Sequence, residues 1–342
     1  MTKFCQESGQ RRVALVYDIL NCGPRNRFVA NGKLIHNSGG DGTNPQNLPR
    51  GGALREAICP PEGYTLVACD SSQIEARTLA WFAGQTDLIK AFANGEDIYS
   101  KFASSVYGKP INKHEHPEER HVGKTCILGL GYGTGAAKLQ HALANGFIKV
   151  NLPAAECERI VKLYRSQYDT IPRLWKDCQN AITNMFNGYS STVGVAVQLP
   201  VSGADHTITL PNGMKLRYPD LQCETNERGF AEYTYQKKRF RAKLYGGSLT
   251  ENLIQSLARI IVAYQMCKIK QELDKTCKAK ADGKIRRVVH MVHDEVIVVV
   301  PDEEAQEVKH MMETIMSTPP KWAPTLPVSC EAGLGKTYGE AK

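Results

Sequence analysis

The sequence predicts an α+β protein with apolar strands toward both ends of the chain and helices in the middle. Tyr64–Asp70 (YTLVACD) is an apolar strand followed at once by a helical pattern. Residues 118–145 and 154–187 have the periodicity of helices, and residues 287–301 (RVVHMVHDEVIVVVP) that of two strands folding back on each other. This order of elements is typical of the α+β class.

The first 36 residues have a separate pattern of short strands without a helix. VALVYDIL (residues 13–20) is followed by a turn at CGPRN and by RFVANGKLIH (residues 27–36). The second stretch contains Asn31-Gly32, a strong hairpin signal. We expect a small all-β unit here.

Local patterns also predict the remaining elements. Residues 207–219 alternate around Asn212-Gly213, which predicts a second hairpin. Ser248–Asp274 is expected to be a long amphipathic helix, and Ser248 and Glu251 have the spacing of a capping box. Shorter helices are expected at Gln73–Phe82 and Glu303–Met316.

The composition is that of a globular protein with reduced thiols. Of the 342 residues, 42% are hydrophobic and 23% charged, and no apolar run approaches the roughly 18 residues that a membrane span requires. The 11 cysteines include no Cys-x-x-Cys pair, which argues against a disulfide framework or a zinc site. We therefore expect a cytoplasmic protein without a membrane partner, in which oxygen atoms hold any metal.

The formal net charge of +8 suggests a polyanionic partner. Residues 1–37 carry six Lys or Arg residues and two acidic ones, a net charge of +4. Elsewhere, basic residues cluster at Lys237–Lys243 (KKRFRAK) and around Lys275–Arg287, where they could follow phosphate groups. A solvated charged surface is an equally open interpretation of either cluster.

Three acidic residues stand at the ends of apolar strands. Asp294 and Glu295 lie at the link of the hairpin in residues 287–301, and Asp70 ends an earlier strand. Two carboxylates 4 Å apart repel by roughly 4 kcal/mol at an effective dielectric constant near 20, so burying them together requires cations. Oxygen ligands without a His or Cys cluster favour Mg²⁺. An ordinary surface turn is the alternative for the hairpin link by itself.

A second candidate site follows the helix expected after residue 118. Arg120, Lys124, Leu128 and Tyr132 recur every four residues and are expected on one helical face. Two cations beside an apolar residue and an aromatic ring suit a triphosphate lying along the helix with a base beyond it. Solvated surface is the ordinary alternative for Arg and Lys on a helix, and the glycines from Gly129 to Gly135 could simply end the helix.

Three stretches together resemble motifs A, B and C of the family A DNA polymerases, particularly the phage type. They are, in chain order, CDSSQIEAR (residues 69–77), RHVGKTCILGLGYG (residues 120–133) and MVHDEVIVVV (residues 291–300). NPQNLPR, LPNGMKLRYP, YGGSLTENLIQ and CEAGLGKTYGEA are also similar to that family, so the resemblance spans about Ser38 to Lys342. It implies an antiparallel palm interrupted by helical fingers, and two-metal transfer of deoxynucleotides to a primer 3′ end.

The resemblance also implies roles for individual residues. The ligands of two Mg²⁺ ions would be Asp70, Asp294 and the carbonyl of Ser71, with Glu295 nearby. The residues that bind the incoming deoxynucleoside triphosphate would be Arg120, Lys124, Leu128, Tyr132 and Glu75, the last by excluding a ribose 2′-hydroxyl. The catalytic set would be Asp70, Asp294, Glu295 and Lys124. The contacts to primer-template DNA would be Gln46, Asn47, Gln255 and His293.

The chain departs from the family pattern at a few positions. Ser71 replaces an aromatic residue, Leu128 replaces Phe or Tyr, and Glu251-Asn252 shifts an expected Asn. The spacing from Asp70 to Asp294 is also longer than we expect for the family. We expect the additional residues to lie between Asn145 and Gly246.

Residues 16–38 resemble the C-terminal end of an intein, through VYD, FVANG and His36-Asn37 followed by Ser38. Ser38 can accept an acyl group, the Asn37 amide can attack its own carbonyl, and His36 can assist proton transfer. Only 36 residues precede Asn37, so we expect one half of a split intein. Its partner would carry the other half and an N-terminal polymerase fragment. A plain edge hairpin followed by a loop is the alternative.

The predicted organisation has four parts: residues 1–37, the intein fragment; 38–84, the first part of the palm; 85–245, the fingers with an insertion; and 246–342, the second part of the palm. The expected function is a DNA-templated DNA polymerase produced by trans-splicing, in the cytoplasm of a phage-infected bacterial cell. Two alternatives stay open: a non-catalytic DNA-binding remnant, and a self-processing module whose polymerase cargo is incidental. Primer extension by spliced product separates them.

Overall fold

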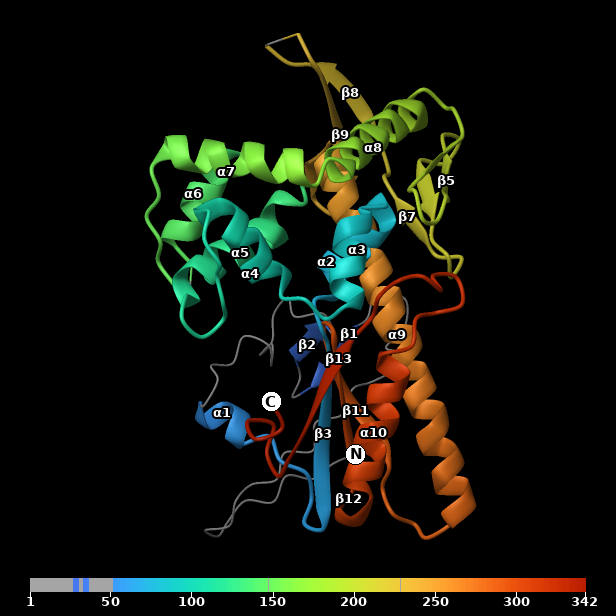
Figure 1. Ribbon diagram of the computed structural model, residues 1–342. Coiled ribbons are helices and arrows are strands. Elements are labelled where there is room, and N and C mark those ends of the chain that lie inside the picture. Colours follow the sequence, from blue (N-terminus) through green and yellow to red (C-terminus); the bar gives the residue numbers. More distant parts are fainter. Residues whose placement is uncertain (1–26, 31–32, 37–51, 147, 228) are drawn as a thin grey trace. The chain divides into compact units, whose positions relative to one another are not determined.

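The computed structural model describes the backbone of residues 27–30 and 33–36, and all of residues 52–342 except 147 and 228 (Figure 1). The chain divides into two compact units. Unit 1 contains the described residues up to Ser72, with Val262–Thr318 and Ser329–Lys342, and unit 2 contains Gln73–Ile261 and Pro319–Val328. The chain therefore leaves unit 1 soon after Asp70 and returns to it within a helix.

Unit 1 is built on a four-stranded antiparallel sheet with the order β11-β12-β3-β13. Its strands are β3 (Tyr64–Ser71), β11 (Arg287–Val292), β12 (Glu295–Pro301) and β13 (Cys330–Gly335). All seven residues of β12 are buried, and β3 is buried over most of its length. The two central strands are therefore buried at nearly every position, as expected for strands covered on both faces.

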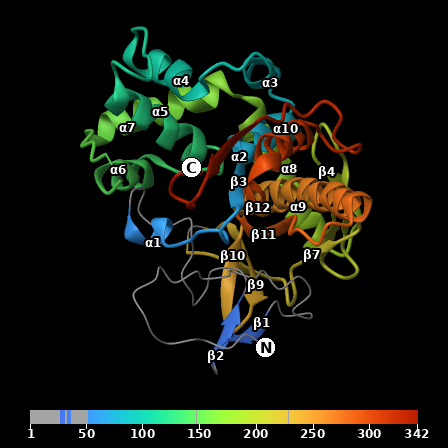
Figure 2. The ribbon, with the colours of Figure 1, turned by 90° about the horizontal axis from the view of Figure 1, so that it is seen from below.

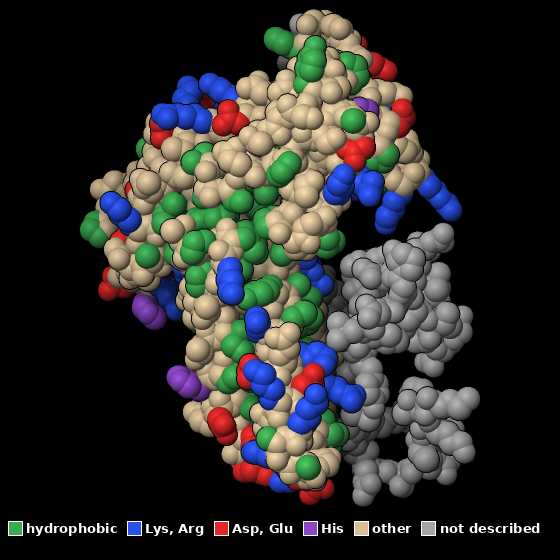
Figure 3. All heavy atoms as spheres, turned by 90° about the vertical axis from the view of Figure 1, so that its right-hand side faces the viewer, with side chains coloured by type: hydrophobic (Ala, Val, Ile, Leu, Met, Phe, Trp, Pro, Cys, Tyr) green, Lys and Arg blue, Asp and Glu red, His purple; other side chains and the backbone are tan. Residues whose placement is uncertain are grey.

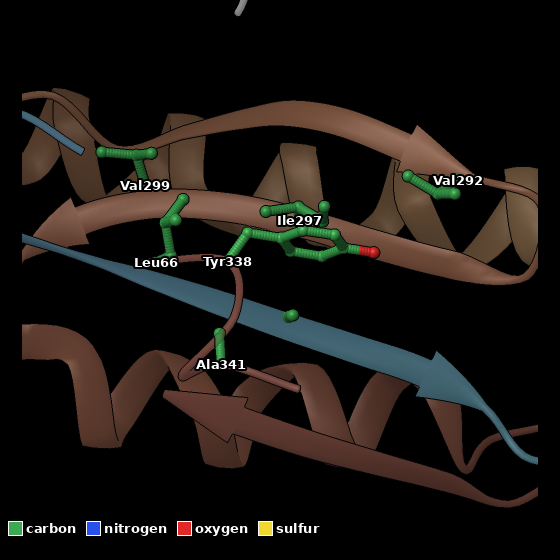
Figure 4. Packing of buried hydrophobic residues seen from close by; sticks show 7 residues of the cluster. Leu66, Val292, Ile297, Val299, Tyr338 and Ala341 are labelled. Atoms are coloured by element: carbon green, nitrogen blue, oxygen red, sulfur yellow. The ribbon is translucent and has the colours of Figure 1, made fainter. Parts of the chain in front are cut away.

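The C-terminal segment covers one face of this sheet. Leu66 of β3 alternates onto that face, as do Ile297 and Val299 of β12. Figure 4 shows the Tyr338 ring lying over Ile297, with its hydroxyl directed toward the Val292 end of the sheet. Tyr338 is 1% exposed, so the segment around it is fixed against the sheet near the turn that follows β11.

A helix, α10 (Ala305–Met316), packs against the same sheet. It follows the short η2 (Asp302–Glu304) and contacts β3 and β13. The buried Gln265 of α9 (Gly246–Lys280) donates from Nε2 to the carbonyl oxygen of Met316 at 2.9 Å. Figure 1 shows the end of α9 beside α10. The helix predicted at Glu303–Met316 is confirmed as η2 followed by α10.

The long helix differs from its prediction at both ends. It begins at Gly246 and continues to Lys280, beyond the expected Ser248–Asp274. The Ser248 hydroxyl accepts from the Tyr245 amide and donates to the Tyr245 carbonyl, both at 2.9 Å. The predicted capping box is wrong because Ser248 lies inside the helix and bonds backward along the chain.

Unit 2 contains most of the described helices. They are α2 (Ile74–Ala83), α3 (Thr86–Ala93), α4 (Ile98–Tyr107), α5 (Pro117–Leu130), α6 (Ala136–Ala144), α7 (Ala154–Gln167) and α8 (Thr170–Phe186), with the first part of α9. Figure 2 shows α4, α5, α6 and α7 gathered in one group. In the part of the chain that the structure describes, no helix combines the length and apolar character that crossing a membrane requires.

Each of the two long stretches predicted to be helical contains two helices. Residues 118–145 form α5 and α6, and residues 154–187 form α7 and α8. At the first break, a Cβ atom at Gly131 would lie 2.5 Å from Leu79 Cδ2, and Gly133 has φ +82°. The left-handed Gly133 therefore turns the chain just after α5 ends at Leu130, and the close approach of Leu79 leaves room only for glycine at position 131.

Two small antiparallel sheets follow α8. One contains β4 (Ser191–Val193), β5 (Leu199–Ser202), β6 (Thr207–Thr209) and β7 (Lys215–Arg217), and the other contains β8 (Gln222–Thr225), β9 (Ala231–Lys237) and β10 (Phe240–Leu244). The hairpin predicted around Asn212-Gly213 is confirmed as β6 and β7. The second sheet was not predicted.

The first described strands are β1 (Arg27–Ala30) and β2 (Lys33–His36), which pair antiparallel with Arg27 opposite His36. This pairing confirms the strands predicted in residues 27–36. The strand predicted at residues 13–20 lies outside the described residues. A short helix, α1 (Ala53–Glu56), precedes β3.

Glycine at position 123 allows α4 and α5 to pack closely. A Cβ atom at Gly123 would lie 2.1 Å from the Tyr99 carbonyl oxygen, whereas one at Gly129, in the same helix, meets nothing within 4 Å. Gly123→Ala should therefore lower the free energy of unfolding by about 1–3 kcal/mol. Gly129→Ala should raise it by up to about 1 kcal/mol, because alanine favours the helix. Urea unfolding of both variants tests this, and equal effects would contradict the close packing.

An ion-pair cluster stabilises the approach to β11. The Arg286 side chain is 0% exposed and donates to Asp282 at 2.7 Å and to Glu304 at 2.6 Å. The hydrogen bonds from Arg286 lower the pKa of Glu304 from its ordinary 4.5 to about 2. A lowered pKa means that the folded state favours the carboxylate, so this stabilisation is complete above about pH 4.5 and is lost as the pH falls toward 2.

Glu304→Gln should remove this acid-dependent contribution and lower stability at neutral pH by about 3 kcal/mol, because the buried guanidinium loses a charged partner. Equilibrium unfolding between pH 2 and 7 measures both effects. Glu303→Gln is the matched control, since Glu303 forms an exposed pair with Lys284 and should contribute less than about 1 kcal/mol. An acid profile of Glu304→Gln identical to that of the parent would refute the assignment.

Candidate functional site

Three acidic residues meet at one end of the unit 1 sheet. In the register of β3 and β12, Asp70 lies opposite Glu295. Asp294 occupies the tight turn between β11 and β12, and its carbonyl accepts from the Ser71 amide at 2.9 Å. The exposed His293 completes the turn with φ +51°. Strand pairing therefore places carboxylates from two distant motifs side by side.

Burial makes ionisation of these groups costly. It raises the pKa of both Asp70 and Asp294, and the charge of Asp294 raises the pKa of Asp70 further. Glu295 is 1% exposed. Burial, and then the charge of Glu295, raise the pKa of the Tyr338 hydroxyl. A cation near this end of the sheet would stabilise the ionised carboxylates.

Lys342 supplies one such cation. Its Nζ lies 3.6 Å from Asp70 Oδ1 and forms an ion pair with Glu295 Oε2. Its charge lowers the pKa of Asp70 and Asp294, which opposes the effect of burial. No sequence signal identified Lys342, because it lies 47 residues after Glu295 and reaches the site through the packing of Tyr338.

The donor atoms at this site are oxygens. Within the described ranges, no three His, Cys, Asp or Glu side chains are grouped closely enough to hold a metal ion by themselves. Asp70 and Asp294 offer a pair of hard ligands, to which a backbone carbonyl and substrate phosphates can add. Such a set suits a hard divalent ion that keeps open coordination positions.

The helix α5 presents a second group of predicted residues. Arg120, Lys124 and Leu128 lie along its more accessible side, and Leu128 is 39% exposed. Tyr132 does not share that face, because α5 ends at Leu130 and Gly131 is its C-cap. The prediction of one helical face is therefore correct for three residues and wrong for Tyr132.

Arg120 and Lys124 differ in their partners. Arg120 Nε donates to Asp97 Oδ2 at 2.6 Å, and its Nη2 to Oδ1 at 3.3 Å. Burial by itself would raise the pKa of Asp97, but hydrogen bonds from Arg120 and Ser100 outweigh burial and lower it. Lys124 is exposed and forms no ion pair with any other described residue, so its ammonium is available to an anion.

Tyr132 is joined to Glu75 within unit 2. Its hydroxyl donates to Glu75 Oε2 at 3.3 Å. Burial, and then the Glu75 charge, raise the pKa of Tyr132. The structure therefore brings together two residues that the sequence assigned to the same nucleotide site.

The other predicted residues are placed as follows. Gln255 is exposed on α9 and donates to Glu251 Oε1 at 3.4 Å. His36 ends β2. Four predicted residues lie outside the described part of the chain: Asn37, Ser38, Gln46 and Asn47.

Figure 3 shows one face of the molecule, on which Lys and Arg side chains stand in several separate groups with Asp and Glu side chains near some of them. The net charge of +8 is thus not gathered into one broad patch on that face.

Lys342→Met should destabilise unit 1 by a few kcal/mol, because it leaves the buried Glu295 carboxylate without its ammonium partner. The double variant Lys342→Met/Glu295→Gln should recover part of the loss, since the remaining partner is then neutral. Chemical unfolding of the parent, both single variants and the double variant measures the coupling. Strictly additive losses would show that the two side chains do not interact.

The chain is similar to known proteins along most of its length. DNA polymerase family A matches residues 40–340. A DNA polymerase of Bacillus phage SP02 is 29% identical over 303 residues, covering 83% of this chain and 43% of that protein. The thermostable DNA polymerase I of Thermus aquaticus is 25% identical over 298 residues, covering 87% of this chain and 30% of that protein. The chain therefore spans less than half the length of these two relatives.

A solved structure shows a similar fold. The POL domain of Pol1 from M. smegmatis, in complex with DNA primer-template and dNTP, aligns with a TM-score of 0.62 and 22% identity. The alignment covers 87% of this chain and 45% of that chain. This likeness confirms the predicted α+β fold class. Because the family match extends over residues 40–340, the chain belongs to DNA polymerase family A.

Proposed function

We propose that the chain is the C-terminal catalytic portion of a DNA-templated DNA polymerase, formed by trans-splicing with an N-terminal partner. The observation that carries the catalytic proposal is the pairing of Asp70 with Glu295, with Asp294 in the adjoining turn. Buried carboxylates of this kind require compensating cations. Family membership supports nucleotidyl transfer as their use.

Asp70 and Asp294 would hold two Mg²⁺ ions, with the Ser71 carbonyl as a further ligand and Glu295 beside them. The raised pKa of both aspartates fits this role, because a bound cation stabilises the form that burial disfavours. The chemistry that bound Mg²⁺ supplies is positive charge, which favours ionisation of the primer 3′-hydroxyl and stabilises the pyrophosphate leaving group.

In this proposal α5 binds the triphosphate of the incoming deoxynucleotide. Lys124 approaches it as an exposed point charge. Arg120 exchanges its bidentate partner Asp97 for phosphate oxygens, which have a similar geometry. The base pairing of the template then supplies the sequence information that these charges do not read.

The base and the sugar are recognised by neighbouring side chains. Leu128 and Tyr132 would pack beside the base. Glu75, held by the Tyr132 hydroxyl, would fill the space that a ribose 2′-hydroxyl needs. The proposed contacts to primer-template DNA are Gln46, Asn47, Gln255 and His293.

The proposed organisation follows from these roles. Residues 38–84 and 246–342 would form the palm, and residues 85–245 the fingers. The N-terminal polymerase fragment would come with the partner polypeptide. The similarity to a phage DNA polymerase supports a phage-infected bacterial cell as the setting.

The splicing part of the proposal concerns residues 1–37. The hairpin of β1 and β2 lies directly before the proposed junction, which supports a β fragment on the N-terminal side of it. His36 would assist protonation, Asn37 would cyclise through its side-chain amide, and Ser38 would carry the acyl group before the final amide forms.

Asp70→Asn and Asp294→Asn should each reduce nucleotide addition by the spliced enzyme by at least about a hundredfold, because each removes a charged metal ligand. DNA binding should be largely unchanged. Primer extension and a binding titration measure the two effects. Asp302→Asn is the matched control. Asp302 pairs with Lys336 at the opposite end of β12 from Glu295, so this variant should extend primers like the parent. Extension by the Asp70 variant at more than a few per cent of the parent rate would rule out the metal role.

Mixing the chain with the partner that carries the other intein half should release residues 1–37 and join Ser38 to the upstream polypeptide. Asn37→Ala should block that release, because the amide nucleophile is absent. Mass spectrometry of the products identifies the tail. Asn44→Ala, a matched control beyond the junction, should splice like the parent. A parent chain that never loses residues 1–37 would contradict the intein assignment.

A further inference from the structure

The basic cluster noted in the sequence forms a hairpin that no proposed polymerase residue uses. β9 and β10 pair antiparallel, with Phe240 opposite Lys237. Lys238 and Arg239 form the two-residue turn between them, and Lys238 has φ +56°. We call residues 237–240 the hairpin tip.

The cations of the tip are not neutralised by neighbours. Lys237, Lys238 and Arg239 are all exposed, and none forms an ion pair with another described residue. The next two basic residues differ. Arg241 pairs with Asp220 at 2.5 Å, and Lys243 pairs with Glu232 at 2.8 Å. Three consecutive cations without counter-charges are complementary to a chain of phosphates.

An aromatic ring stands beside these cations. Phe240 is 58% exposed and follows Arg239 directly. By the strand register, Phe240 is on the same face as Tyr235 and Tyr233, which are buried. Tyr235 packs edge-on against Tyr218 with ring centroids 5.1 Å apart, but the sheet face continues past this packing to Phe240. An exposed ring among cations provides a stacking surface for an unpaired base.

The base of the hairpin is rigidly held. Arg241 donates to the Asp220 carboxylate, to the Asp220 carbonyl at 2.8 Å and to the Thr234 hydroxyl at 3.0 Å. The Tyr233 hydroxyl donates to Thr183 of α8 at 3.1 Å. The tip is therefore fixed on unit 2, which reduces the entropy lost when it binds a ligand.

We propose that the hairpin tip binds single-stranded nucleic acid. Lys237, Lys238 and Arg239 follow the phosphates, and Phe240 stacks on one unpaired base. The phosphates of a duplex would also attract the three cations, but its paired bases are not free to stack on Phe240. The cations and the exposed ring together therefore favour a single strand. The unpaired template of the proposed polymerase would be such a strand, and to that extent the inference rests on the proposed function.

The test titrates the full 342-residue chain into fluorescein-labelled oligothymidylate at several KCl concentrations. Each neutralised phosphate contributes about 0.7 to the slope of log affinity against log salt for a single strand, so Lys237→Ala/Lys238→Ala/Arg239→Ala should reduce the slope by about 2. Phe240→Ala should weaken binding about tenfold with the slope unchanged, because stacking is not ionic. Phe240→Tyr should retain the parent affinity.

The matched control replaces three other exposed lysines of unit 2, with Lys138→Ala/Lys162→Ala/Lys176→Ala. It should alter the slope far less than the hairpin variant. Equal slopes for the two triple variants would overturn the proposal and identify the tip as solvated charged surface. A loss confined to a duplex probe would also overturn it.

The proposed catalytic function can fail separately. The oligothymidylate titration contains neither primer nor deoxynucleotide, so its outcome does not depend on nucleotide addition. Spliced Asp70→Asn enzyme that extends primers normally would contradict the metal site. Weak oligothymidylate binding by the hairpin variants would still support the proposal for the hairpin tip.

Discussion

The pairing of β3 with β12 is the constraint on which the rest of the site depends. Its register places Asp70 opposite Glu295, and the tight turn after β11 adds Asp294. A slip by one residue would direct these carboxylates to the other face of the sheet. The tight turn at His293 and Asp294 and the hydrogen bond from the Ser71 amide to the Asp294 carbonyl at 2.9 Å oppose such a slip. The backbone pairing that forms the sheet thus also keeps like charges together.

The carboxylates create an electrostatic cost that the fold only partly offsets. Burial raises the pKa of both aspartates, and Lys342 lowers it. Lys342 reaches the site because Tyr338 is packed across the sheet, so the apolar core and the charge balance involve the same C-terminal segment. That segment cannot be linked to Asp70 from spacing, since the two are joined only by tertiary packing. The sequence did predict the strand ends and the acidic residues on them, because apolar runs and turn residues are local signals.

Two parts of unit 2 also differ from the prediction: the end of α5 and the sheet of β8, β9 and β10. The helix after residue 118 was predicted to continue through Tyr132, but Gly131 lies against Leu79 and the helix ends at Leu130. The glycines from Gly129 to Gly135 were a local signal for a helix end, but apolar periodicity by itself did not show that the helix would stop before Tyr132. The sheet of β8, β9 and β10 was not predicted from the sequence. β9 does alternate, with Tyr233 and Tyr235 buried at every second position, but the packing of these tyrosines against Phe186 and Tyr218 is tertiary and is not visible in the sequence. The basic cluster was visible in the sequence, but its exposed ring and its rigid base were not.

The central claim is that Asp70 and Asp294 form a divalent metal site. Crystals of the chain soaked in Mn²⁺, with diffraction data collected at the manganese absorption edge, test it most directly. The account predicts anomalous density bound by carboxylate oxygens of both aspartates, and its loss in crystals of Asp70→Asn. The absence of density at this end of the sheet in the parent, with Lys342 still 3.6 Å from Asp70, would contradict it.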